Sequence, residues 1–231
     1  MQLSKRLWTV ASMVRETGCL ADIGTDHGYI PIFLVQQGKI KSAIAMDVKE
    51  GPLARARDNI RLYGLEDKIE TRRSDGLEKL KEGEADSIVM AGMGGLLTIR
   101  ILKAGQSILK GIKEFILQPQ SEISEVRRFL QEQEYQIIEE NMVEEEGKYY
   151  PMMRVVHGKM EPWTQIEYLY GKYLLERKDP CLLAFLEQEE RIYQTVEEHL
   201  KENKTLKAVQ RQREIDNKIC LIREAKKAIQ S

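Results

Sequence analysis

The sequence predicts an α/β protein with a doubly wound, mostly parallel sheet that ends in an antiparallel hairpin, followed by an all-α appendage. Up to about residue 160, short apolar runs alternate with helical patterns and turn signals. Two strand candidates then flank an acidic tract at 144–146. From about residue 162, helical spacing continues with only Gly171 and Pro180 as breakers. We therefore expect two domains, 1–160 and 161–231.

The first domain begins with an amphipathic helix that Gly18 closes, and a short buried strand, Cys19–Ile23, comes next. Each later element is bounded by glycine, proline or a polar cluster. The expected elements are helix 29–37, strand 42–47, helix 51–63, strands 69–73 and 86–90, helix 96–109, strand 114–118, helix 121–133 and strands 135–142 and 150–157. Five strand–helix repeats predict a parallel sheet whose ligand site lies outside the carboxyl ends of the strands.

The second domain is expected to hold two long helices joined near residues 201–206, paired as an antiparallel, coiled-coil-like hairpin. From Lys201 to the end, nine basic side chains stand against four acidic ones, a local surplus of five. This surplus fits a face that contacts a polynucleotide, and it fits a solvated helix face equally well.

The composition narrows the class of protein. The 231 residues contain 36 basic and 37 acidic side chains, a formal net charge of −1, and 42% of residues are hydrophobic. These values are typical of a soluble globular protein and exclude a mainly disordered or collagen-like chain. Without an apolar run long enough to span a membrane, or a secretory signal, we expect a cytoplasmic protein with no membrane partner. The spacing of Cys19, Cys181 and Cys220 predicts no metal site, and a monomer is favoured.

The most informative loop is Asp22–Gly28, which follows a strand and precedes a helix. Gly24 allows a sharp turn and close approach of a ligand. Asp26 occupies the middle position of the dinucleotide fingerprint, where its charge would repel a pyrophosphate, and this argues against a dehydrogenase. Carboxylates instead suit a cationic ligand with a ribose and an amino group, such as S-adenosylmethionine. The alternative is an ordinary turn in which Asp26 caps the helix.

Three further loops follow strands at the same predicted edge. Asp47 ends the second strand, where an acidic residue typically accepts hydrogen bonds from both ribose hydroxyls. Asp75 and Gly76 follow the third strand, and Asp75 suits an adenine amine, although an Asp-Gly pair is also a common turn. Ala91–Gly95 follows the fourth strand and keeps side chains out of a space that a ligand would occupy. Gln118-Pro119 follows the fifth strand at the same rim.

Together these motifs resemble a class I, Rossmann-like S-adenosylmethionine-dependent methyltransferase. More narrowly, the sequence resembles the bacterial tRNA (adenine-22-N1)-methyltransferase family in four segments: Ser4–Leu7, Ala21–Pro31, Gly51-Pro52 and Ala91–Gly95. The helical appendage is similar too. The sequence departs from the family's more frequent residues at Asp47, where Glu is usual, and at Gly28, where Ala is frequent. The Asn/Asp-Pro-Pro-aromatic motif of exocyclic amino methyltransferases is absent after the fourth strand, which favours a ring nitrogen as the target.

The resemblance implies S-adenosylmethionine as cofactor, tRNA as partner and N1 of adenine 22 in the D-loop region as methyl acceptor. It assigns Asp26 to stabilising the positive charge that methylation leaves on adenine, and His27 to positioning. The cofactor-binding candidates are Asp22, Gly24, Thr25, Gly28, Asp47, Asp75, Gly76, Ala91, Gly92, Met93 and Gly94. The substrate-binding candidates are Arg6, Tyr29, Gln118 and Pro119. Two alternatives remain: a small-molecule methyltransferase and a non-enzymatic Rossmann-like binding module.

Overall fold

The computed structural model describes the backbone of residues 1–201 and 206–230, and the side chains of 1–200 and 210–230. The chain divides into two compact units, Met1–Pro162 and Trp163–Ser231.

The first unit is built on a seven-stranded sheet of order β3-β2-β1-β4-β5-β7-β6. The five strands from β3 to β5 are parallel, whereas β7 runs antiparallel to β5 and pairs with β6 as a hairpin. The predicted mixed sheet is therefore confirmed. The strands are β1 (Cys19–Ile23), β2 (Ser42–Asp47), β3 (Ile69–Arg73), β4 (Ser87–Met93), β5 (Glu114–Pro119), β6 (Tyr135–Glu145) and β7 (Lys148–His157).

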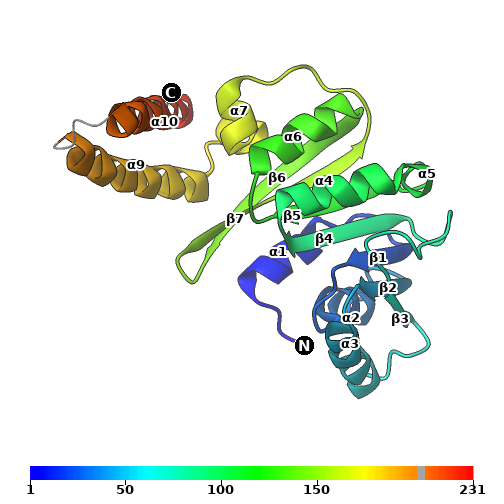
Figure 1. Cartoon of the computed structure of the whole chain (residues 1–231). Helices are drawn as coiled ribbons and strands as arrows, with labels where there is room; N and C mark the ends of the chain where they lie inside the picture. The colour runs from blue at the N-terminus through cyan, green and yellow to red at the C-terminus, as the bar shows by residue number, and fades with distance from the viewer. Residues whose placement is uncertain (202–205, 231) are drawn as a thin grey trace. The chain divides into compact units, whose positions relative to one another are not determined.

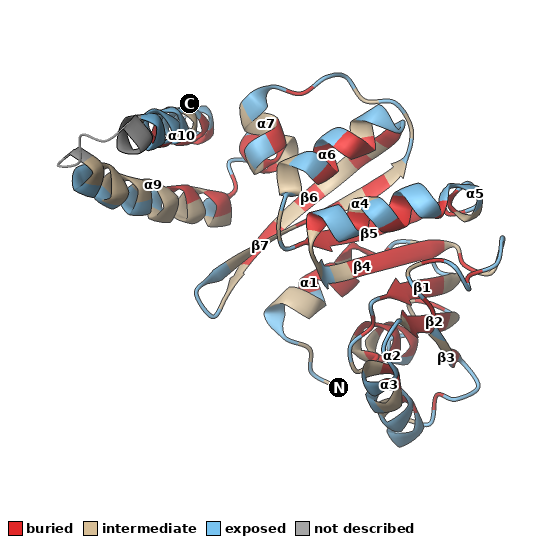
Figure 2. Cartoon of the chain, in the orientation of Figure 1, coloured by how far each residue is buried: buried red, intermediate tan, exposed pale blue. Residues whose placement is uncertain are grey.

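Helices cover both faces of the sheet, as Figure 1 shows. The helices on one face are α1 (Lys5–Met13), α2 (Tyr29–Gln36) and α3 (Glu50–Leu62). Those on the other are α4 (Gly95–Ala104), α5 (Gln106–Leu109) and α6 (Ile123–Glu132). The central strands are buried on both faces, which is why they read as continuous apolar runs (Figure 2).

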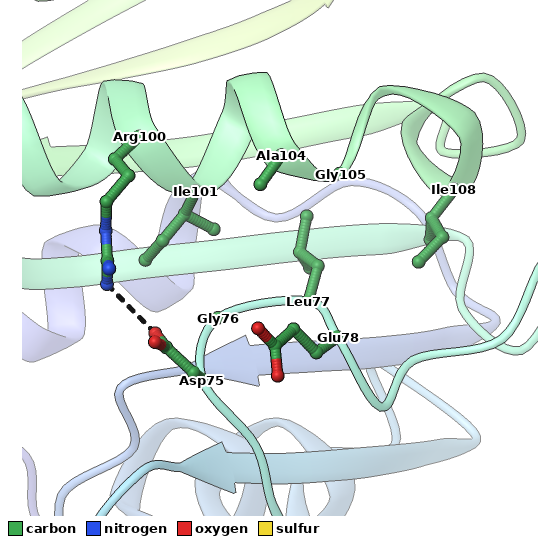
Figure 3. Close-up of a pocket in the computed structure, with 9 residues that line it drawn as sticks. All are labelled: Asp75, Gly76, Leu77, Glu78, Arg100, Ile101, Ala104, Gly105 and Ile108. Atoms are coloured by element: carbon green, nitrogen blue, oxygen red, sulfur yellow. Dashed lines mark hydrogen bonds and ion pairs between the residues drawn. The ribbon is translucent and has the colours of Figure 1, made fainter.

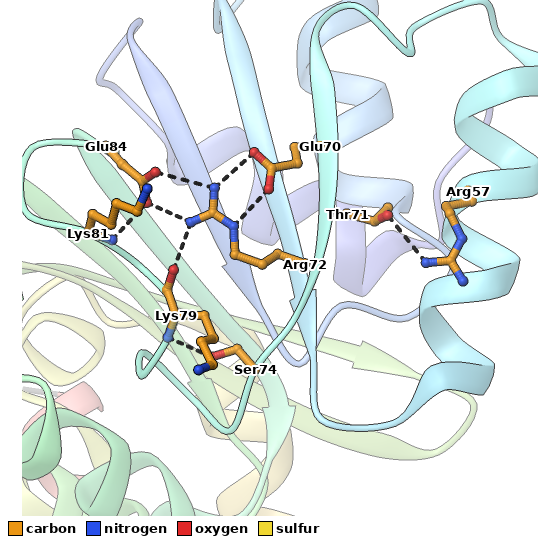
Figure 4. A network of polar contacts seen from close by, with 8 residues as sticks. All are labelled: Arg57, Glu70, Thr71, Arg72, Ser74, Lys79, Lys81 and Glu84. Atoms are coloured by element: carbon orange, nitrogen blue, oxygen red, sulfur yellow. Dashed lines mark hydrogen bonds and ion pairs between the residues drawn. The ribbon is translucent and has the colours of Figure 1, made fainter.

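The connection from β3 to β4 contains no helix, so four strand–helix repeats replace the five expected. Residues 74–86 form turns instead, tied down by Arg72. Its guanidinium bonds both oxygens of Glu70, both oxygens of Glu84 and the Lys79 carbonyl (Figure 4). The pKa of the Glu84 carboxyl is lowered, chiefly by the hydrogen bonds from Arg72. These ion pairs therefore fix the loop that carries Asp75, since no helix packs it against the sheet.

Other boundaries also differ from the sequence-based expectation: α1 ends at Met13 and not at Gly18, and β6 extends to Glu145 instead of 142. The helix expected at 96–109 is divided at Gly105, a position that admits only glycine because a Cβ there would lie 2.3 Å from Cδ1 of Leu77. Strand β4 continues beyond Met90 to Met93, and its register with β5 shifts around Gly92, which has φ +87°. This irregularity bends the end of β4 into the glycine-rich loop.

The second unit contains helices α7 (Gln165–Tyr170), α8 (Lys172–Glu176), α9 (Pro180–Lys201) and α10 (Leu206–Gln230). The last two pair antiparallel, since Glu190 of α9 bonds Arg223 and Lys226 of α10 while Tyr193 bonds Lys218. Buried residues of α10 recur every three or four positions at Ile215, Ile219, Ile222, Ala225 and Ile229. The expected helical hairpin is thus present, and the helical run before it is interrupted at Gly171 and at 177–179, next to the two expected breakers Gly171 and Pro180.

Candidate active site

A cavity of about 290 Å³ lies at the carboxyl edge of the sheet, beside the loop between β1 and α2. The sequence predicted seven of the residues that line it, and it did not predict the apolar pair Leu7 and Ile30. The lining residues are Arg6, Leu7, Asp22, Gly24, Asp26, His27, Tyr29, Ile30 and Ala91. The loop after β1, the start of α1 and the end of β4 therefore meet at one place, as the parallel topology predicts.

The turn after β1 is fixed by the neighbouring strand. The backbone N–H groups of Gly24 and Thr25 both donate to the Met46 carbonyl, at 2.8 and 2.9 Å. Gly24 has φ +75°, and a Cβ on it would lie 2.8 Å from Cε of Met93. A side chain is therefore excluded both by the left-handed backbone and by Met93, which leans over the turn.

Asp22 is buried at the base of the cavity. Burial raises the pKa of its carboxyl to about 6, the Thr25 hydroxyl opposes the rise, and the charges of Asp47 and Asp26 add to it. The half-buried Asp47 ends β2, and its Oδ1 accepts a hydrogen bond from the Lys49 N–H at 2.7 Å. Three carboxylates thus load one small region with negative potential.

Asp26 and His27 lie at the mouth of the cavity. The Asp26 side chain is 69% exposed, and its Oδ1 lies 3.1 Å from Nη2 of Arg55 and 3.5 Å from Nε2 of His27. The His27 ring stacks on Tyr29 with centroids 5.0 Å apart and planes 9° apart. The N-cap of α2 is Gly28, and among the described contacts the Asp26 carboxylate pairs with Arg55 and bonds no backbone N–H of α2. The helix-capping interpretation of Asp26 is therefore wrong.

Arg6 lines the cavity and is held by Gln118, which does not line it. Arg6 donates from Nη1 to Oε1 of Gln118 at 3.0 Å, and its guanidinium lies 5.4 Å from the Tyr150 ring centroid. Gln118 is fully buried, and Pro119 is buried beside Met93 in the β4–β5 register. Arg6 is thus a half-buried, anchored group and not a free surface arginine.

Asp75 and Gly76 line a separate, smaller cavity of about 110 Å³ beneath α4 (Figure 3). The Asp75 carboxylate pairs with Nη2 of Arg100 at 2.9 Å. Gly76 has φ +54°, and a Cβ there would lie 2.9 Å from the Ile101 side chain. The structure therefore does not bring this pair into the cavity of Asp22 and Asp26, although both lie at the same edge of the sheet.

The glycines at the end of β4 and just after it leave space at the carboxyl edge of the sheet. Gly92 is exposed, and a Cβ there would face Nη1 of Arg6 at 3.6 Å. Gly94 is the N-cap of α4, and a Cβ on it would lie 3.2 Å from the Ser121 hydroxyl oxygen. Gly95 admits no side chain, because the Ser121 carbonyl would be 2.4 Å away. Gly95 thus serves packing, while Gly92 leaves room beside Arg6.

The sequence analysis missed Asn59, which sits on α3 outside the cavity. Its amide donates to the His27 carbonyl at 2.9 Å. The sequence signal that could have indicated Asn59 is its position, four residues after Arg55 and eight after Gly51, which puts it on the same helix face as Arg55. No motif draws attention to a single asparagine in a helix.

These residues fit S-adenosylmethionine, whose sulfonium and ammonium are cations and which carries no phosphate. Carboxylates of Asp22 and Asp26 line the cavity, and Asp47 lies at the next strand end. The left-handed turn at Gly24 leaves backbone exposed for close approach. Fold and site together define a class I S-adenosylmethionine-dependent methyltransferase.

Comparison with known proteins identifies the particular family. The family described as "TrmK: tRNA (adenine(22)-N(1))-methyltransferase" matches residues 20–224. The tRNA (adenine(22)-N(1))-methyltransferase of Bacillus subtilis is 36% identical over 205 residues, covering 87% of this chain and 86% of that protein. The chain therefore belongs to the tRNA (adenine(22)-N1)-methyltransferase family and is an S-adenosylmethionine-dependent enzyme.

Solved structures agree over nearly the whole chain. The B. subtilis m1A22 tRNA methyltransferase TrmK has a TM-score of 0.87 at 34% identity, covering 97% of this chain and 99% of that one. Streptococcus pneumoniae Sp1610, solved with S-adenosyl-L-methionine, has a TM-score of 0.88 at 34% identity, covering 97% and 100%. TrmK of M. capricolum, solved with S-adenosyl-homocysteine, has a TM-score of 0.85 at 29% identity, covering 98% and 99%.

None of the helices within 1–201 and 206–230 combines the length and apolarity needed to cross a membrane. Among the side chains that the structure describes, no three His, Cys, Asp or Glu residues gather as metal ligands would.

Proposed function

We propose that methyl transfer from S-adenosylmethionine to N1 of adenine 22 of tRNA takes place in the cavity beside the β1–α2 loop, with Asp26 as the catalytic carboxylate. The observation that carries this proposal is the set of acidic side chains around a left-handed turn that has no phosphate-cradling glycine pattern. An edge of this kind favours a cationic methyl donor over a nucleotide diphosphate.

The donor is held by the loops that end β1, β2 and β4. Asp22 and Asp47 supply negative charge, and Asp47 is placed to accept hydrogen bonds from ribose hydroxyls. Gly24, Thr25 and Gly28 form the turn, while Ala91, Gly92, Met93 and Gly94 border the same edge. Asp75 and Gly76 bind adenine only when the Asp75–Arg100 ion pair opens, since Arg100 occupies the Asp75 carboxylate.

The bound donor supplies an electrophilic methyl group. Adenine N1 has a free lone pair at neutral pH, so the protein needs no strong base and contributes mainly by orientation, worth about 7–11 kcal/mol in favourable cases. As the new N–C bond forms and the S–C bond breaks, positive charge passes from sulfur to the adenine ring. The carboxylate of Asp26 stabilises that ring electrostatically, and His27 positions the reacting groups.

Four residues are assigned to the substrate. N1 lies on the pairing edge of adenine, so the base must be exposed before it reacts. The stacked rings of Tyr29 and His27 offer a surface for that base. Arg6, anchored by Gln118 next to Pro119, is placed to meet a phosphate.

We assign tRNA contact to the basic residues of α10. Since tRNA is the substrate, we also propose that the protein acts in the cytoplasm. Of the predicted basic residues, four are paired within the second unit: Arg211, Lys218, Arg223 and Lys226. The side chains of Lys201, Lys204 and Lys207 lie outside the described residues. Arg213 and Lys227 are exposed, and we place the phosphate contacts there first.

The test is transfer of labelled methyl to an unmodified tRNA transcript, followed by mapping of the modified nucleotide, with Asp26→Ala beside the unaltered protein. We expect 1-methyladenosine at position 22 and a rate lowered about 100-fold in the variant. Label in a small molecule only would support a small-molecule methyltransferase. Failure to bind S-adenosylmethionine in calorimetry would support a non-enzymatic module.

A further inference from the structure

Helix α3 presents three residues to the loop that carries Asp26 and His27. Nη2 of Arg55 lies 3.1 Å from Oδ1 of Asp26, and Asn59 Nδ2 lies 2.9 Å from the His27 carbonyl oxygen. Between these contacts, a Cβ on Gly28 would lie 3.4 Å from Cβ of Ala56, which is close packing of backbone on helix. Positions 55, 56 and 59 share one face of a helix. This face of α3 therefore contacts three successive loop residues, Asp26, His27 and Gly28.

The loop needs such support because its backbone is unusual. His27 has φ +60°, in the left-handed region that favours glycine. A non-glycine residue persists there only when surrounding contacts fix it. The hydrogen bond from Asn59 to the His27 carbonyl is such a contact, and it sets the direction in which the His27 ring leaves the backbone.

Asp26 needs support for a different reason, since most of its side chain is exposed. An exposed carboxylate samples several rotamers unless a partner holds it. The Arg55 guanidinium lies beside Gly51, one turn earlier on α3, where a Cβ would be in ordinary contact with its Nη1 at 3.7 Å. The guanidinium therefore lies along the first turn of the helix and faces the loop.

Neither Arg55 nor Asn59 lines the cavity. Both act on groups that do line it, so their effect is on where Asp26 and His27 point and not on the volume available to a ligand. We propose that Arg55 and Asn59 are positioning residues for methyl transfer, acting through Asp26 and His27. This inference rests on the proposed function, in which Asp26 is the catalytic carboxylate.

The test measures kcat, the KM for tRNA and the Kd for S-adenosylmethionine in the full-length protein. We expect Arg55→Ala and Asn59→Ala to lower kcat at least tenfold, while the KM and the Kd change less than about threefold. Arg55→Lys keeps the charge without the planar fork and should recover part of the loss. Arg57→Ala is the matched control, since Arg57 is a similarly exposed arginine on the same helix that pairs with Glu50 instead.

A double substitution separates this inference from the proposed function. In an Asp26→Asn background, Arg55→Ala should have little further effect on kcat, because the group it positions has lost its charge. Full activity of Asp26→Asn would overturn the catalytic role of Asp26. An impaired Asp26→Asn together with an unimpaired Arg55→Ala would overturn only the positioning role. A raised KM for tRNA with unchanged kcat would instead make Arg55 an RNA contact.

Arg55 is half exposed, so its substitution is expected to leave folding intact. If Asn59→Ala lowers the melting temperature, Asn59→Asp provides the second variant, because it keeps the size of the side chain and removes the N–H donor. A loss of kcat in this variant supports the proposal, and wild-type kcat contradicts it.

Discussion

At the scale of the residue, Asp22 is the group whose chemistry the structure changes most. Burial raises the pKa of its carboxyl from 3.8 to about 6. Between these pH values the folded protein holds a proton that the unfolded chain releases, so the stabilising contribution is present at low pH and is lost as the pH rises through 6. Ionisation of Asp22 therefore destabilises the free protein, and a bound cation would stabilise the ionised carboxylate.

This coupling predicts that S-adenosylmethionine binds more weakly below pH 6, because a proton must leave Asp22 before its carboxylate meets a cation. We expect the Kd at pH 5 to be about tenfold higher than at pH 7. Calorimetry across pH 5–8 measures it. Asp22→Asn should give a weaker but flatter profile over this range, and an unchanged slope in that variant would assign the effect to another group.

Asp47 gives a second residue-scale prediction. Hydrogen bonds between a carboxylate and neutral hydroxyls contribute about 1.5–3 kcal/mol. Asp47→Ala is therefore expected to raise the Kd for S-adenosylmethionine about 10- to 100-fold. Asp47→Glu keeps the charge on a longer side chain and should lose much less. Equal affinity of Asp47→Ala and the unaltered protein would remove Asp47 from the cofactor site.

The sequence predicted that Asp22 and Gly24 after β1 would meet Ala91 of β4 in one cavity, because strand ends in a parallel sheet meet at one edge. It could not predict that Asp75 pairs with Arg100 beneath α4, because this contact joins residues 25 positions apart through side-chain geometry alone. Asn59 was missed for the same reason, since its partner is a backbone carbonyl that carries no residue-type signal.

At the scale of the element, α6 is attached to β6 by a fully buried ion pair. Nε and Nη2 of Arg127 each lie 2.8 Å from Oε1 of Glu140, and the two side chains are 1% and 0% exposed. Removing one partner leaves an uncompensated charge in the core, whereas replacing both with apolar residues of similar volume is often neutral.

We therefore expect Arg127→Met to destabilise the protein by about 3–5 kcal/mol, and Arg127→Met combined with Glu140→Met to recover most of that loss. The midpoint of urea denaturation, followed by circular dichroism, measures both. Lys159→Met, which removes an exposed pair with Glu134, is the control and should have little effect. A double variant as unstable as the single one would show that unpaired charge is not the cause.

Element boundaries were predictable where a local signal decides them. Gly38 and Gly64 follow helix ends as expected, whereas α1 ends at Met13 and not at Gly18. The expected breakers Gly171 and Pro180 match the interruptions at 171 and 177–179, and Asp179-Pro180 is a helix-start signal. The Oδ1 of Asp179 accepts from the N–H groups of Cys181 and Leu182, at 2.9 and 3.1 Å. The expected elements include no helix between 73 and 86, and the structure has turns there, but the Arg72 ion pairs that hold these turns carry no sequence signal.

At the scale of the whole molecule, the chain combines a cofactor-binding sheet domain with a helical unit that has its own buried seam. The composition of the chain shows no basic excess, so attraction to RNA has to come from a local surface. On α10, Arg213 and Lys227 lie fourteen positions apart, which places them on one helix face about 21 Å apart. Two phosphates of a folded RNA could contact them together.

This surface predicts how tRNA binding depends on salt. Each phosphate contact releases counterions, so Arg213→Gln and Lys227→Gln should each weaken tRNA binding several-fold and reduce the slope of log Kd against log salt by about 1. Filter binding at several salt concentrations measures the slope. Glu224→Gln, an exposed acid on the same helix, should leave binding unchanged or slightly tighter. Identical slopes in the unaltered protein and in both variants would place the RNA contacts elsewhere, because the slope reports the number of phosphate contacts.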